Sequence, residues 1–98
     1  HFPGKPIMPG VLQIEAMAQV SSVLIFSEDG EPRDKLAFFM GVEKAKFRRT
    51  VVPGDQLYIE AEMVHFRHNA CKVKAKAMVE GDVAAEAVMT FNLMNARA

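Results

Sequence analysis

The chain has 98 residues, half of them hydrophobic, and this composition predicts one small globular domain and excludes a disordered chain. Twelve basic residues balance twelve acidic residues, so the net charge gives no support for binding to nucleic acid. The single cysteine, Cys71, excludes an intrachain disulfide framework and suits a reducing compartment.

The first ten residues, HFPGKPIMPG, contain three prolines and two glycines and predict a rigid loop. His1 stands at the head of this loop. Pro9 suits the first turn of a helix, where its missing N–H costs nothing. We therefore expect a helix to begin near Pro9 and Gly10.

The run PGVLQIEAMAQVSSVLIF, residues 9–26, predicts a helix that ends near Phe26 or Ser27. It is apolar nearly all round, so we expect it to be buried on all sides. Glu15 is the only charged residue between Val11 and Phe26. A buried carboxylate must be paired, hydrogen-bonded or protonated, and a paired core carboxylate is the alternative to a catalytic one. Because polar side chains interrupt the run, we expect no membrane span.

After a polar connection, SEDGEPRDK at 27–35, the hydrophobic period changes to two, which predicts strands. The first, LAFFMGVEKAKFRR at 36–49, loses its alternation near Gly41, and a bulge there would explain the change. A turn at 51–55 and further strands near 57–63, 71–79 and 83–93 follow. We expect turns at His68-Asn69 and at Gly81-Asp82.

Consecutive strands joined by tight turns pair antiparallel. A helix that is apolar on every side must be wrapped by that sheet and by a partner subunit. The expected fold class is therefore α+β, with a curved antiparallel sheet wrapped around a long central helix.

Three groups near the start of the helix form a candidate reaction site. His1 on its stiff loop and Glu15 on the helix are a candidate acid/base pair. The free N–H groups at the helix start favour developing negative charge, and Gly10 would let a ligand oxygen approach the backbone. A base, an acid and an oxyanion donor together suit proton abstraction next to a carbonyl, but the spacing does not select the substrate.

Two segments, HFPGKPIMPGVLQIEAMAQ at 1–19 and FRRTVVPGDQL at 47–57, resemble the β-hydroxyacyl-[acyl carrier protein] dehydratases of bacterial-type fatty acid synthesis, the FabZ family. The resemblance implies the hot-dog fold. It also implies a hydro-lyase that converts (3R)-3-hydroxyacyl thioesters on acyl carrier protein to trans-2-enoyl thioesters in type II fatty acid biosynthesis. No metal or organic cofactor is implied. His65 and His68 are interpreted as solvated edge histidines.

By position, the resemblance makes His1 the catalytic histidine and Glu15 the catalytic carboxylate, and it gives Gly10 the N–H that holds the thioester oxygen. Gln19 is either a supporting residue or an interface amide. The histidine and the glutamate of one site come from different subunits, which implies a homodimer or a hexamer built as a trimer of dimers. The family acts in the cytoplasm, or in the plastid stroma of a eukaryote.

Glutamate at position 15 favours plain dehydration, because the related dehydratase-isomerase family carries aspartate there. An acyl-thioesterase and a non-catalytic acyl-thioester-binding domain are the alternatives within the fold. The family has a helix and strands before the HFPG motif, so residues 1–98 are expected to be a single, N-terminally truncated domain.

Two further sets of residues are expected around the site. An apolar tunnel beside the helix would hold the acyl chain, with these lining residues: Met8, Val11, Phe26, Phe38 and Met40. The basic run near residue 46 would dock the acidic carrier protein through Lys44, Lys46, Arg48 and Arg49. Plain core packing and a solvated strand face are the respective alternatives, and Lys72, Lys74 and Lys76 form a competing basic stripe.

Overall fold

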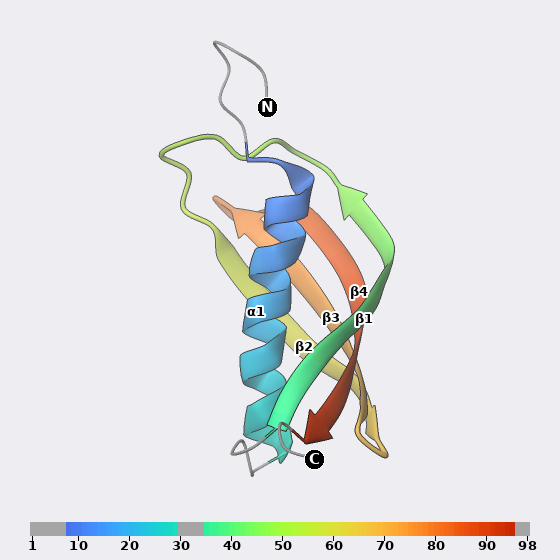
Figure 1. Cartoon of the computed structure of the whole chain (residues 1–98). Coiled ribbons are helices and arrows are strands. Elements are labelled where there is room, and N and C mark those ends of the chain that lie inside the picture. The colour runs from blue at the N-terminus through green and yellow to red at the C-terminus, as the bar shows by residue number, and fades with distance from the viewer. Residues whose placement is uncertain (1–7, 30–34, 96–98) are drawn as a thin grey trace.

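The computed structural model describes residues 8–29 and 35–95, and side chains from 8 to 27 and 35 to 95. One helix, α1 (Gly10–Asp29), is followed by four strands (Figure 1). They are β1 (Lys35–Phe47), β2 (Tyr58–Arg67), β3 (Ala70–Val79) and β4 (Asp82–Asn95). The His1 loop lies outside the described residues.

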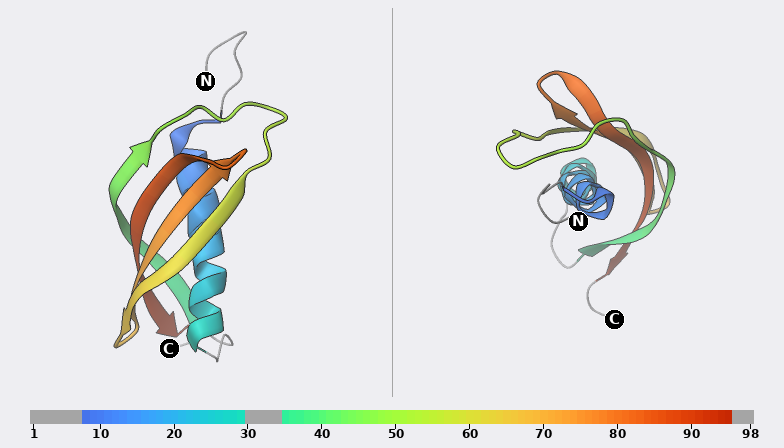
Figure 2. Two further views of the ribbon diagram at one scale, coloured as in Figure 1. Left: turned by 180° about the vertical axis from the view of Figure 1, so that it is seen from behind. Right: turned by 90° about the horizontal axis from the view of Figure 1, so that it is seen from above.

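The four strands form one antiparallel sheet in the order β1-β4-β3-β2. Seen along the helix, the sheet curves around one side of α1 (Figure 2). Two hairpins join β2 to β3 and β3 to β4, whereas residues 48–57 carry the chain from β1 at one edge to β2 at the other. Consecutive strands therefore pair with each other, as expected, only in the two hairpins, whereas β1 and β2 lie at opposite edges of the sheet.

The core lies between α1 and the concave face of the sheet. Alternate residues of β3 and β4 are buried there because successive strand side chains point to opposite faces. Ala75 lies opposite Ala87, and Ala77 lies opposite Ala85. The helix contributes the fully buried Met17 and Ile25 to the same cluster. The α+β arrangement expected from the sequence is confirmed.

The bulge expected near Gly41 is confirmed by a register shift between Phe39 and Gly41. A second shift, between Glu43 and Lys46, was not predicted, and Lys44 there has a φ of 55°. Each bulge inserts an extra residue and exchanges the two faces of the strand. The first bulge exchanges the faces to which alternate side chains of β1 point, and the second bulge restores them.

Both hairpin turns use two residues with positive φ, as type I′ turns require. The turn at His68-Asn69 is confirmed, with φ values of 53° and 67°. The turn between β3 and β4 lies one residue earlier than the Gly81-Asp82 turn predicted from the sequence. It consists of Glu80 and Gly81, with φ values of 50° and 83°, and β4 already begins at Asp82.

The expectation that α1 is buried on all sides is wrong for the single chain. Val11, Glu15, Gln19 and Val23, spaced four residues apart, form one exposed stripe, with Val11 73% and Val23 70% exposed. The physical reason is that four strands curve around only one side of the helix (Figure 2). Glu15 is therefore an exposed residue of this chain and is not a buried one.

By length and composition alone α1 could cross a membrane, since its Gly10–Ser27 window has a mean hydropathy of 1.3. The same property is found in the core helices of soluble proteins. Met17, Ser21 and Ile25 lie fully buried along the inner side of α1, with Met17 and Ile25 in one cluster with β3 and β4. This packing favours the interpretation of α1 as a core helix.

Candidate functional site

The start of α1 is fixed by the connection between β1 and β2. The Met8 N–H donates to the Val51 carbonyl at 2.6 Å. Val51 is itself buried against Val79 and Ala84, with Met8 packed on the same small cluster. The N-terminal end of α1 is thereby held against the end of the sheet where residues 48–57 cross (Figure 1).

Two N–H groups at this helix start have no acceptor among the described residues. The N–H groups of Leu12 and Gln13 both donate to the Pro9 carbonyl, at 3.0 and 3.3 Å. Gly10 and Val11 precede them, and no acceptor is recorded for either backbone N–H. Unpaired N–H groups at a helix start can stabilise a negatively charged oxygen.

Gly10 is constrained by its neighbour Phe47. A Cβ atom at position 10 would lie 3.0 Å from two ring carbons of Phe47, which is too close without movement of the ring. The sequence suggested that glycine here admits a ligand oxygen. The structure adds a packing reason, because β1 ends with an aromatic side chain against the first residue of α1.

A hollow of about 410 Å³ opens beside this helix start, and we call it the helix-start hollow. Its lining residues are Met8, Pro9, Gly10, Gln13, Phe47, Arg48, Arg49 and Thr50. It therefore combines an apolar floor, unpaired backbone donors and two guanidinium groups. That combination suits a ligand with a polarised carbonyl and a negatively charged group.

Carboxylates at the start of β4 hold both arginines of the hollow. Arg48 Nε lies 2.8 Å from Glu86 Oε2, and Arg49 Nη1 lies 3.3 Å from Asp82 Oδ2. The hydrogen bond from Arg48 lowers the pKa of Glu86 and outweighs the opposing effect of partial desolvation. The positive charges of Arg48, Lys46 and Lys76 lower this pKa further. Each arginine of the hollow is therefore already paired with a carboxylate of β4.

Glu15 lies on the same helix as Gly10 but on its open side. The apolar surroundings expected for this carboxylate are not supplied by its own chain, because the stripe it belongs to is exposed. Gln19 lies on the same stripe one turn later. The described residues therefore bring Gly10 together with Arg48 and Arg49, while Glu15 and Gln19 face away from the sheet.

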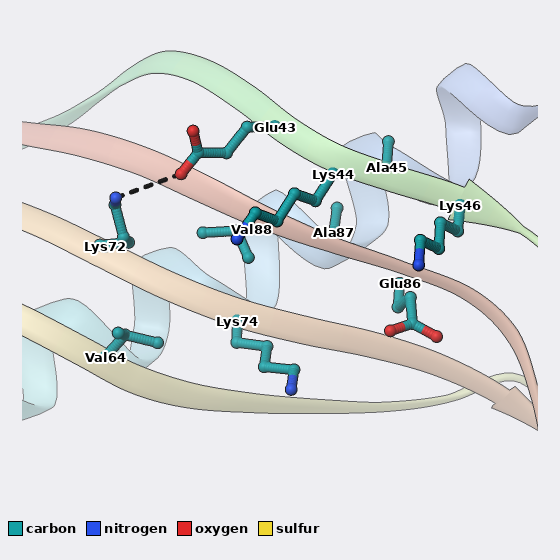
Figure 3. A pocket seen from close by; sticks show the side chains of 10 residues that line it. All are labelled: Glu43, Lys44, Ala45, Lys46, Val64, Lys72, Lys74, Glu86, Ala87 and Val88. Atoms are coloured by element: carbon teal, nitrogen blue, oxygen red, sulfur yellow. Dashed lines mark ion pairs between the residues drawn. The ribbon is translucent and has the colours of Figure 1, made fainter.

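The expected docking residues separate into two groups. Arg48 and Arg49 line the helix-start hollow, whereas Lys44 and Lys46 line a second hollow of about 540 Å³ on the convex face of the sheet (Figure 3). We call this second one the outer hollow. Its full lining is Glu43, Lys44, Ala45, Lys46, Val64, Lys72, Lys74, Glu86, Ala87 and Val88.

Two lysines of the stripe expected to compete with the docking run lie in the same outer hollow. Lys72 and Lys74 come from β3 and stand across β4 from Lys44 and Lys46 (Figure 3). Lys72 Nζ is paired with Glu43 Oε1 at 3.1 Å. Lys44 and Lys46 of the expected docking run therefore share one hollow with two lysines of the stripe expected to compete with it.

The residues expected to line an acyl tunnel are not gathered in one place. Met8 and Phe26 are half-buried, but Val11, Phe38 and Met40 are exposed. Phe38 pairs with Asn92 and shares its face, which is the face turned away from α1. Phe39 instead contacts the buried Phe91, with ring centroids 5.4 Å apart. On β1, Phe39 is thus better placed than Phe38 to face the helix.

One polar residue of the hollow was not singled out from the sequence. Gln13 is 3% exposed, and its Oε1 atom is buried without a hydrogen-bond partner among the described residues. The only signal in the sequence was an amide within an apolar helix. No group of three or more potential metal ligands is present in the part of the chain that the structure describes.

Comparisons with known proteins give one family and one fold. The model of the FabA-like domain matches residues 1–88. A 3-hydroxyacyl-[acyl-carrier-protein] dehydratase FabZ of Thermus thermophilus is 50% identical over 96 residues, which are 98% of this chain and 68% of the relative. The bifunctional enzyme LpxC/FabZ of Chlorobaculum tepidum is 47% identical over 94 residues, which are 96% of this chain but 20% of that enzyme.

Solved structures agree on the fold at low sequence identity. A thioesterase superfamily member from Thermus thermophilus has a TM-score of 0.83 at 16% identity, covering 96% of this chain and 67% of that one. A hexameric thioesterase from Yersinia pestis has a TM-score of 0.78 at 16% identity, covering 89% and 72%. Such likeness shows the fold alone, and it confirms the hot-dog arrangement of a helix against a curved antiparallel sheet.

Proposed function

The chain belongs to the FabA-like domain family, and on this premise we propose that it dehydrates (3R)-3-hydroxyacyl thioesters carried by acyl carrier protein to trans-2-enoyl thioesters. The observation that carries this proposal is the 50% identity over 96 residues to a FabZ dehydratase. The match to the family model covers residues 1–88, which include the HFPG loop and the helix with Glu15. The reaction belongs to fatty acid biosynthesis, and we propose that residues 1–98 form one dehydratase domain that acts in the cytoplasm or plastid stroma.

In the proposed reaction, His1 removes the proton from the carbon next to the thioester carbonyl. The electron pair forms the new carbon–carbon double bond as the bond between the β-carbon and the hydroxyl oxygen breaks. Glu15 gives a proton to that oxygen, which leaves as water. A proton passed from His1 back to Glu15 restores the starting state.

Gly10 supports this reaction by stabilising the charge that develops on the thioester oxygen. Its N–H, for which no acceptor is recorded among the described residues, lies at the positive end of the helix, and Gly10 lines the hollow. A single well-placed donor of this kind contributes about 3 kcal/mol to a transition state. No step of the scheme needs a group other than the side chains and backbone of the protein.

We propose that a second copy of the chain covers the exposed stripe of α1 and completes the site. The stripe includes Val11 and Val23, which are exposed by 73% and 70%. Large apolar side chains on one helix face are typical of an interface. A dimer formed through this stripe would give Glu15 the enclosed surroundings that an acid group in catalysis needs. A hexamer would be three such dimers.

An assay of products separates this proposal from a thioesterase and from a binding domain. We expect the protein to convert a (3R)-3-hydroxyacyl thioester to the enoyl thioester, followed by chromatography, with no free thiol released. Thiol release without the enoyl product would indicate the thioesterase activity named for several structural neighbours. Binding without turnover would indicate a non-catalytic domain, and either result would contradict the proposal.

We propose that Lys44 and Lys46 of the outer hollow, with Arg48 and Arg49 of the helix-start hollow, dock the acidic carrier protein. The substitutions Lys44→Glu and Lys46→Glu break no ion pair recorded among the described residues. We expect this double variant to lower kcat/KM about tenfold or more on the carrier-bound thioester, mainly through slower association, and less so at high salt.

The control for this prediction is Arg67→Glu, an exposed charge reversal at the opposite end of the molecule, in the β2–β3 hairpin (Figure 1). It should leave kcat/KM on the carrier-bound thioester nearly unchanged. A small uncharged thioester should react with the lysine double variant as with the native protein. Equal losses on both substrates would assign these lysines to the fold or the site, and docking would be disproved.

A further inference from the structure

Gln13 is a buried amide whose hydrogen bonds are poorly satisfied. Its side chain is 3% exposed, and Oε1 has no partner among the described residues. Its Nε2 donates to the Met8 carbonyl at 3.5 Å, which is at the limit of a hydrogen bond. Leaving a buried acceptor unpaired costs stability, so a purely structural amide at this position would be a poor choice.

The position of Gln13 relates it to the proposed reaction site. It lies three residues after Gly10, on the same side of the helix, and both line the helix-start hollow. Arg48 and Arg49 line the same hollow. Backbone donors, an amide acceptor and two cations therefore surround one space.

We propose that Gln13 is a positioning residue that accepts a hydrogen bond from an amide N–H of the arm that bears the thioester. The inference depends on the proposed function, in which the substrate is carried on a pantetheine arm. Along that arm the thioester carbonyl, the amides and the phosphate follow in order. Gly10 supplies a backbone donor for the thioester carbonyl, and Gln13 supplies an acceptor for an amide N–H. Arg48 and Arg49 lie on the same hollow, where each is already paired with a carboxylate, so the amide and not the phosphate is the group that the inference concerns.

A modest rotation of the side chain is needed, because Oε1 is buried in the free protein. The rotation sacrifices only the long 3.5 Å contact with Met8 and gains a partner for an oxygen that has none. Arrival of the amide N–H therefore satisfies a group that the free protein leaves unsatisfied. This makes binding of the arm, and not stability of the fold, the property that Gln13 serves.

The test uses two thioesters of one hydroxyacyl group that differ at a single position, an N–H group in one and an oxygen in the other. The first is the N-acetylcysteamine thioester, which has one amide N–H. The second is the 2-acetoxyethyl thioester, in which an ester oxygen replaces that N–H. We expect the native protein to show a KM about tenfold lower for the amide than for the ester, at similar kcat.

The main variant is Gln13→Met, which keeps the length of the side chain and removes its polar atoms. We expect it to raise the KM of the amide substrate to that of the ester, with kcat and the temperature of unfolding kept or slightly raised. Ser21→Ala is the matched control. It removes another buried polar group of α1, whose hydroxyl already donates to the Met17 carbonyl at 2.7 Å. It should leave the preference for the amide unchanged.

If Gln13→Met does not fold, Gln13→Glu retains an acceptor oxygen and should retain the preference for the amide. The inference is overturned if native protein and Gln13→Met distinguish the two thioesters equally, or if Gln13→Glu loses the preference while folded. If the native protein dehydrates neither thioester, the proposed function itself is disproved.

Discussion

Replacement of Glu15 by glutamine should lower kcat for dehydration about 100- to 10,000-fold, because an amide has the size of the carboxyl group but cannot supply its proton. The temperature of unfolding should change little. Glu15 lies on the exposed stripe of α1, and no ion pair or hydrogen bond to it is recorded among the described residues. The activity and the fold of the chain should therefore respond very differently to the same substitution.

The control for Glu15→Gln is Glu62→Gln, which removes another exposed negative charge, on β2. Glu62 lies opposite Lys74 in the sheet and lines neither of the hollows around Gly10 and Lys46. Its replacement should leave kcat within about twofold, because surface charge pairs contribute little. If Glu15→Gln retained full activity, or lost activity only in step with loss of the folded oligomer, the proposed acid role would be wrong.

The sequence predicted the fold well where periodicity alone decides the structure. The change from a helical run to a period of two located α1 and the later strands, and alternation along β3 and β4 identified their buried faces. The position of Gly41 correctly indicated a bulge. Local patterns of this kind reflect which side chains avoid water, and the sequence therefore contains them directly.

The sequence did not predict features that depend on contacts between distant residues. The pairing of β1 with β4, rather than with β2, places Phe47 against Gly10. The second bulge at Lys44 places Lys46 beside Glu86 on the convex face. Neither follows from spacing, because each depends on the register between strands that are far apart along the chain.

The exposed side of α1 is the clearest feature that the sequence did not predict. Its sequence is apolar nearly all round, and complete burial was the natural expectation. In the structure the sheet covers one side, and Val11, Glu15 and Val23 face outward. An apolar stripe that includes a carboxylate is consistent with a helix whose second side is covered by another subunit. The apolar sequence of α1 is therefore explained by an assembly of chains and not by the single chain.

Complementation between inactive chains tests the central claim most directly, namely that His1 of one chain acts with Glu15 of another. The variants His1→Ala and Glu15→Ala should each be almost inactive alone. In a co-expressed mixture about half of the dimers are mixed, and each mixed dimer has one intact site of two, so about a quarter of the native activity should return. If tags on the two variants prove that mixed dimers form and the activity stays at the level of either variant alone, the account of a shared site is contradicted.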